Sequence, residues 1–318
     1  MLDLSGGELT ALKVLSNTSG LTMAELAQRM GGSASVATRA VQHLEQRQFV
    51  TTVRTRQKRV SLSTSAHALA FQALLNLHPH VDFASTLSHS SLRVLSAFTG
   101  RACTIGKMAQ RSRTPQVSVR RVVSRLMEQG ILVRQMGREY QVALSGLENF
   151  VQAYCRFALG EKCGSAGFIH VGPNAVVRTS NPVPPLLAPT GLSVLNEYGV
   201  DLIQADAHDY YVNLFDESGK KVTFEQALVH ALLRATLISS GRESAYALLA
   251  MNKNWNRFDR ASFFEEADDF NVLNVANEAV GRIERFQRKA PWLEPLTISM
   301  PMAGTLWPSL DEFQELVD

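Results

Sequence analysis

The sequence lacks the features that mark membrane, secreted and zinc-binding proteins. It has no apolar run of about 18 residues or more, so no transmembrane helix is expected. Its three cysteines, Cys103, Cys155 and Cys163, form no CxxC pair, which argues against a disulfide framework and a zinc site. The first residues lack the basic start and apolar core of a signal peptide. We therefore expect a reduced cytoplasmic protein without membrane contact.

Known catalytic motifs are missing as well. The chain contains no GxxxxGK[ST] phosphate loop, no GxGxxG, no HExxH and no GxSxG. The densest acidic cluster, residues 265–269, predicts a solvated helix face rather than a metal site. Asp206, His208 and Asp209 are interpreted as a loop, because neither a nucleophile nor a phosphate cradle accompanies them. The sequence thus predicts a protein that is not an enzyme and needs no metal or cofactor.

What the chain does have is an uneven distribution of charge. Residues 1–150 carry 18 Lys and Arg against 8 Asp and Glu, a net charge of +10. Residues 151–318 carry 14 and 21, a net charge of −7. A basic half joined to an acidic half indicates that the basic part binds a polyanion and that the acidic part has a different partner.

The basic half contains an internal repeat. A shift of 82 residues overlays Ala27-Gln28-Arg29 on Ala109-Gln110-Arg111, Arg39 on Arg121 and Val60 on Val142, without a gap. A repeat of this length predicts a duplicated module rather than a short solenoid unit.

The first module is predicted from its caps and its apolar spacing. Capping boxes at Ser5 and Thr22 begin two helices, and a third covers residues 35–47. The third helix places its apolar residues on one face at Ala37, Ala40, Val41 and Leu44. A β-hairpin follows, with arms at residues 49–53 and 60–62 and a basic tip between them.

The second module repeats this order. Thr104 caps a short helix, and Thr114-Pro115 opens a helix with apolar residues Val119, Val122, Val123 and Leu126. Gly130 ends that helix, and residues 131–133 pair with residues 140–144. A further helix, residues 145–159, is predicted to pack on the next domain or to form a dimer seam.

This order of elements resembles MarR-like and related winged-helix regulators at residues 22–44 with the wing 54–59, and again at residues 104–126 with the Arg138 wing. The resemblance implies a mainly α fold with small β wings (α+β). We expect tandem winged helices at residues 1–78 and 79–160, followed by a mixed, mostly helical domain at residues 161–318.

In helix-turn-helix proteins the second helix of the motif enters the major groove of double-stranded DNA, while a wing can lie along the phosphates. The recurring Arg39 and Arg121 are our strongest expected DNA contacts. The full predicted set is Ser33, Ser35, Thr38, Arg39, Gln42, His43, Arg54, Arg56, Lys58, Arg59, Arg111, Arg113, Gln116, Ser118, Arg120, Arg121, Ser124, Arg125 and Arg138.

The acidic half resembles, more distantly, the C-terminal domain of AbiEi-type antitoxins and related prokaryotic regulators. The resemblance rests on residues 189–199, in which Thr190 is expected to cap a helix, on a strand at residues 210–215 and on residues 226–233. A capping box of Thr223 with Gln226 is expected to begin the helix that holds the last of these segments. Those proteins carry one winged helix, whereas two are expected here. The resemblance implies autoregulation or a toxin-linked role, with the acidic half serving dimerisation, a protein partner or an effector.

Three functions follow from these observations. The first is a sequence-specific, nucleoid-associated transcriptional regulator, acting as a homodimer or as a monomer that covers two major grooves. The second is a protein-binding subunit of a chromosome-condensing complex, against which the net charge of +10 argues. The third is a plasmid or viral replication initiator.

Overall fold

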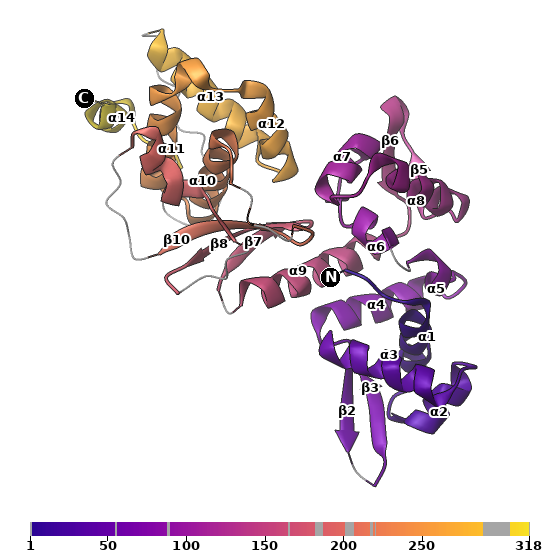
Figure 1. Cartoon of the computed structure of the whole chain (residues 1–318). Coiled ribbons are helices and arrows are strands. Elements are labelled where there is room, and N and C mark those ends of the chain that lie inside the picture. The colour runs from indigo at the N-terminus through magenta and orange to yellow at the C-terminus, as the bar shows by residue number, and fades with distance from the viewer. Residues whose placement is uncertain are drawn as a thin grey trace. The chain divides into compact units, whose positions relative to one another are not determined.

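The chain folds into two compact units, residues Met1–Lys162 and Cys163–Asp318 (Figure 1). The computed structural model describes residues 2–54, 56–87, 90–164, 166–181, 187–200, 207–216, 219, 221–288 and 306–317. These residues form mostly helices with small antiparallel sheets, so the expected α+β class is confirmed. Among the described helices, none combines the length and the apolar character that crossing a bilayer requires.

The first repeat follows the predicted order of elements. The capping boxes of Ser5 with Glu8 and of Thr22 with Glu25 both form. Its short strands make an antiparallel sheet in the order β1-β3-β2. The elements are α1 (Gly6–Asn17), β1 (Leu21–Thr22), α2 (Met23–Arg29), α3 (Ala34–Gln46), β2 (Val50–Arg54), β3 (Lys58–Leu62) and α4 (Ala66–Leu77).

The second repeat places matching elements 82 residues later. When 82 is added to the first and last residue numbers of β1, α2 and α3, the results are the bounds of β4, α7 and α8. The left-handed turns recur too, since Gly31 (φ 65°) corresponds to Arg113 (φ 50°) and Gln48 (φ 55°) to Gly130 (φ 70°). The elements are α5 (Phe83–Thr86), α6 (Ser90–Leu95), β4 (Cys103–Thr104), α7 (Ile105–Arg111), α8 (Gln116–Glu128), β5 (Leu132–Arg134), the 3-10 turn η1 (Met136–Arg138), β6 (Glu139–Val142) and α9 (Leu147–Cys163).

The two hairpins differ in length, so the prediction that the repeats overlay without a gap is wrong at this place. Val50 pairs with Leu62, whereas Leu132 pairs with Val142, so the second hairpin is two residues shorter. Val142 therefore takes the place of Leu62 and not that of Val60. Side chains alternate between the two faces of a strand, so a slip of two residues keeps the apolar pattern and leaves no trace in the sequence.

Helix α9 packs back onto the first repeat, a contact that the sequence did not predict. The ring of Phe150 lies 4.9 Å from that of Phe71, and the ring of Tyr154 lies 5.0 Å from that of Phe49. On the same helix, the amide of Gln152 donates to the carbonyl of Phe98 in the second repeat, at 2.6 Å. Helix α9 thereby ties the two repeats into one unit.

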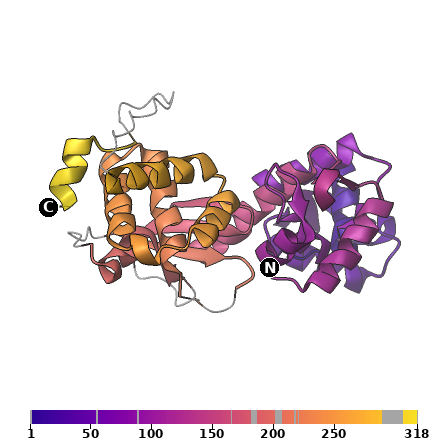
Figure 2. The same cartoon turned by 90° about the horizontal axis from the view of Figure 1, so that it is seen from above.

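The second unit combines one sheet with a layer of helices. Its sheet has the order β7-β8-β10-β9, and the capping box of Thr223 with Gln226 begins α10 as predicted. Figure 2 shows the helices of this unit lying over its strands. The helix expected after Thr190 forms at Gly191–Tyr198, as a 3-10 helix. The elements are β7 (Phe168–Val171), β8 (Asn174–Thr179), β9 (Ala188–Pro189), η2 (Gly191–Tyr198), β10 (His208–Asn213), α10 (Phe224–Ile238), α11 (Gly241–Lys253), η3 (Trp255–Arg257), α12 (Arg260–Asp269), α13 (Leu273–Gln287) and α14 (Leu310–Val317).

Candidate nucleic-acid interface

Helix α3 exposes the polar side that the sequence predicted. It buries Ala37, Ala40, Val41 and Leu44, as the apolar spacing requires. The six predicted contact residues of this segment are all exposed: Ser33, Ser35, Thr38, Arg39, Gln42 and His43. The hydroxyl of Ser33 also accepts from the backbone N–H of Val36, so it caps the helix at its exposed end.

Contacts with helix α1 fix one edge of this surface. The Nδ1 atom of His43 lies 3.1 Å from a carboxylate oxygen of Glu8, which is 2% exposed. Arg47 donates to the same carboxylate at 3.2 Å. His43 is therefore held at the α1 side of α3 while about half of its side chain stays accessible.

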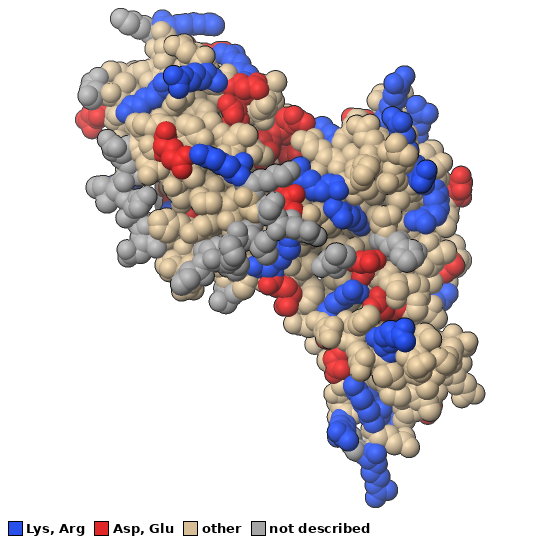
Figure 3. Space-filling model, viewed as in Figure 1, with Lys and Arg blue, Asp and Glu red and all other residues tan. Residues whose placement is uncertain are grey.

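The first hairpin carries four exposed cations near its tip (Figure 3). Arg59 donates to the carbonyl of Gly20 at 2.7 Å, and the ammonium of Lys58 lies 3.3 Å from the Glu45 carboxylate. A hydrogen bond from Thr52 lowers the pKa of Glu45 and keeps this carboxylate charged beside Lys58. Arg54 and Arg56 have no hydrogen-bond or ion-pair partner among the described residues.

Helix α8 presents a second surface of the same kind. It buries Val119, Val122, Val123 and Leu126, as predicted. Gln116, Arg120, Arg121 and Ser124 are exposed, and Ser118 is half-buried. Arg121 lies where Arg39 lies on α3, and neither guanidinium has a partner among the described residues.

A hollow of about 410 Å³ separates α8 from the second hairpin. Three arginines line it: Arg120 from α8, Arg134 from β5 and Arg138 from the tip. No carboxylate stands among its lining residues, which also include Gln116 and Tyr140. The hollow therefore offers several guanidinium donors to one anion, the arrangement that suits a phosphate group.

Two predicted contact residues point inward instead. Arg111 is 7% exposed and donates to the carbonyl of Ala97 at 2.9 Å, so its guanidinium is directed into the protein in this structure. Arg125 is half-buried and donates to the hydroxyl of Ser91, which anchors α8 on α6. Arg113 is exposed, but its left-handed backbone serves the turn, and its carbonyl accepts from Arg93 at 3.0 Å.

Four further residues belong to these surfaces and were missed from the sequence. Arg134 lies one residue beyond the predicted hairpin arm of residues 131–133, and it is exposed at the end of β5. Val36, Val117 and Met136 are 45%, 59% and 95% exposed. The predicted set of contacts contains only polar and charged residues, whereas exposed apolar residues on such a surface can contact the methyl group of thymine.

In the second unit Asp209 and Asp269 take buried positions that the sequence did not predict. Asp209 lies on β10 rather than in a loop and is 1% exposed; Asp206 lies outside the described residues. On α12, Glu266 accepts from Gln226 at 3.0 Å and lies 3.2 Å from His230, and Asp269 is 7% exposed. The predicted solvated acidic face is thus partly a packing surface. Among the described residues no group of side chains is arranged to hold a metal ion.

Comparison with known proteins identifies one part of the chain. The model of the MarR family matches residues 2–59, which span α1 to the beginning of β3. No curated protein matches the chain. The match supports a MarR-like winged-helix domain at residues 2–59. In that domain α3 takes the place of the second helix of the helix-turn-helix, and β2 and β3 take the place of the wing.

Proposed function

We propose that the protein is a sequence-specific regulator of transcription that binds double-stranded DNA through both repeats of its first unit. The MarR family match supports a DNA-binding regulator for residues 2–59. The observation that carries the proposal is the exposed side of α3, which offers hydroxyl, amide and guanidinium groups beside a wing with four cations. It bears no acidic residue before Glu45 in the last turn of the helix.

The second repeat is, on this proposal, a second winged helix. Its helices α7 and α8 recur at the same spacing as α2 and α3, and its hairpin borders a hollow lined by three arginines. The proposed domains are residues 1–78, 79–160 and 161–318. The last of these is assigned to dimerisation or a protein partner, in the way the antitoxin-like resemblance implies.

The two repeats should read different base sequences. The exposed residues of α3 include Thr38, Gln42 and His43, whereas α8 offers Gln116, Arg120 and Arg121. Because α9 packs on the first repeat, the spacing between the two surfaces is fixed within the unit. We therefore expect one chain to bind an asymmetric DNA site whose two halves differ in sequence. A homodimer would bind two copies of this site.

A salt titration of duplex binding tests the proposal. Fluorescence anisotropy with a duplex selected from a random pool should give a logarithm of affinity that falls linearly with the logarithm of salt concentration. A selected duplex should also bind at least about 1,000-fold more tightly than an unrelated duplex of equal length. Absence of binding, or binding that salt does not weaken, would show that the protein is not a DNA-binding regulator.

The Arg121→Ala variant should lose about tenfold in affinity for the selected duplex and discriminate less well at one base pair, because an arginine contacts guanine through two hydrogen bonds. Arg39→Ala should have the same effect at a different base pair. Selection of binding sites with each variant measures both changes. If each variant weakens all duplexes equally, these arginines contact phosphates and not bases.

A further inference from the structure

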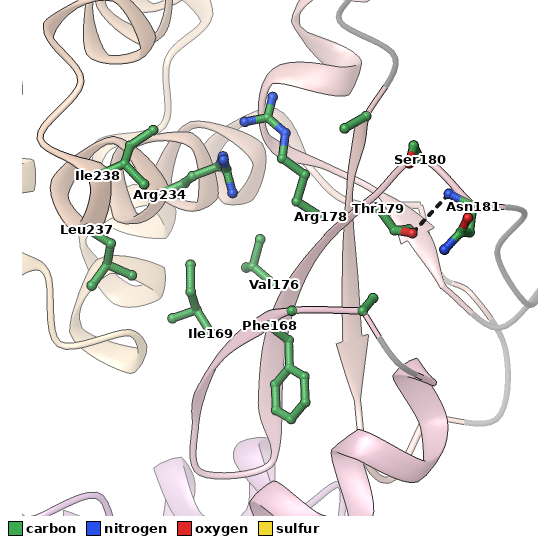
Figure 4. A pocket seen from close by; sticks show the side chains of 13 residues that line it. Phe168, Ile169, Val176, Arg178, Thr179, Ser180, Asn181, Arg234, Leu237 and Ile238 are labelled. Carbon is green, nitrogen blue, oxygen red and sulfur yellow. Dashed lines mark hydrogen bonds between the residues drawn. The ribbon is translucent and has the colours of Figure 1, made fainter.

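A hollow of about 590 Å³ opens in the second unit, between the C-terminal end of α10 and the strands β7 and β8 (Figure 4). Its apolar side is formed by Ile169 and Val176 from the strands and by Leu237 and Ile238 from the helix. Leu237 and Ile238 are 49% and 46% exposed, so the hollow presents accessible aliphatic surface. A hollow of this size accommodates a small organic molecule.

Two arginines stand at one end of the hollow. Arg178 comes from β8 and Arg234 from α10, and both line it. Both guanidinium groups form ion pairs with the same two carboxylates, those of Asp209 and Glu243. The Arg178 guanidinium lies 2.8 Å from Glu243 and 3.5 Å from Asp209, and Nε of Arg234 lies 3.3 Å and 3.9 Å from them.

The carboxylates do not line the hollow, so it presents donors rather than acceptors. Asp209 is 1% exposed as a side chain and Glu243 is 15% exposed, whereas Arg178 and Arg234 are 21% and 19% exposed. The two terminal nitrogens of Arg234 have no acceptor among the described residues. A guanidinium whose outer nitrogens lack acceptors is suited to bind a carboxylate.

We propose that this hollow binds an amphipathic monoanion, an aliphatic carboxylate whose head group meets Arg234 and Arg178 and whose chain covers Ile169, Val176, Leu237 and Ile238. The apolar side selects a hydrocarbon chain, since contact with it removes exposed aliphatic surface from water. The two carboxylates balance the charges of the two arginines, so the ligand is held by the outer N–H donors of the guanidinium groups rather than by net positive charge. We therefore expect a singly charged head group, because a dianion such as phosphate costs more to desolvate and is repelled more strongly by Asp209 and Glu243.

Calorimetric titration of the full chain with decanoate tests the site. Decanoate should bind saturably at one site per chain and about tenfold or more tightly than decan-1-ol, which corresponds to one charge-assisted hydrogen bond. Decyltrimethylammonium and inorganic phosphate should not bind there. The proposal is overturned if decanoate fails to saturate, if decan-1-ol binds equally well, or if phosphate binds more tightly than decanoate.

Two variants separate the head group from the chain. Arg234→Gln should weaken decanoate binding about tenfold and leave decan-1-ol unaffected. Leu237→Ser leaves the ion pairs intact and should weaken both ligands. Leu69→Ser on α4 is the matched control, because Leu69 is 47% exposed and lies in the other unit. Equal decanoate affinity in Leu237→Ser and Leu69→Ser would place the ligand elsewhere.

The experiments test the ligand site and the proposed DNA binding independently of each other. Decanoate binding is measured without DNA, and duplex binding is measured without decanoate. A chain that binds duplex but not decanoate retains the proposed function and loses only the ligand site.

Discussion

Replacing Arg54 and Arg56 together with alanine should weaken duplex binding by roughly 30-fold at about 0.15 M salt. Each phosphate contact contributes about 0.9 to the slope of the logarithm of affinity against the logarithm of salt concentration, so two contacts contribute about 1.8. These two arginines suit the test because they have no partner among the described residues, so their removal leaves the contacts of the hairpin unchanged. Lys58 and Arg59, in contrast, contact Glu45 and Gly20.

Anisotropy titrations between about 50 mM and 300 mM salt measure the slope for both proteins. The matched control is Arg257→Ala with Arg288→Ala, which removes the same charge from two exposed residues of the second unit. The control should keep both the affinity and the slope. If the two double variants lose the same affinity, net charge rather than the wing governs binding, and the proposed interface is wrong.

Phe150→Ala should lower the free energy of unfolding of the first unit by about 3–5 kcal/mol. Phe150 is fully buried on α9, and its ring lies 4.9 Å from that of Phe71 and 6.4 Å from that of Phe49. Because both partners belong to the first repeat, the truncation opens a cavity where the two repeats meet. The loss should therefore exceed that of an exposed apolar residue such as Leu69, whose truncation should cost under about 1 kcal/mol.

Urea denaturation can separate the two units, because all three tryptophans of the chain lie in the second unit. Circular dichroism should report an earlier transition for Phe150→Ala, while the midpoint of tryptophan fluorescence should stay unchanged. Leu69→Ala should leave both midpoints near those of the parent protein. An unchanged dichroism midpoint for Phe150→Ala would mean that α9 does not pack on the first repeat in solution.

The sequence was most informative where structure depends on neighbours along the chain. Capping residues and an apolar repeat are local signals, and they predicted the beginnings of α1, α2 and α10. The same periodicity assigned Arg39 and Arg121 to the exposed sides of their helices, because residues at that spacing face away from the buried ones. This is why most of the proposed interface could be predicted without a structure.

Side chains whose partners lie far along the chain could not be predicted in this way. Arg111 is directed to Ala97 and Arg125 to Ser91, and no local pattern distinguishes them from arginines that face solvent. A long side chain can point in many directions, and the tertiary neighbour that offers an acceptor decides among them. The ion pairs at the hollow have the same origin. Arg178 on β8 lies beside Asp209 because β8 pairs with β10, and Arg234 reaches Asp209 because α10 packs nearby.

The sequence by itself determined the order of the elements, the duplication and the polar sides of α3 and α8, since these follow from spacing within one helix. Only the tertiary structure decided which arginines stay accessible, where α9 packs and that a hollow with two arginines exists in the acidic half. Those features depend on contacts between segments that are distant in the chain. The spacing of residues within one segment does not predict such contacts.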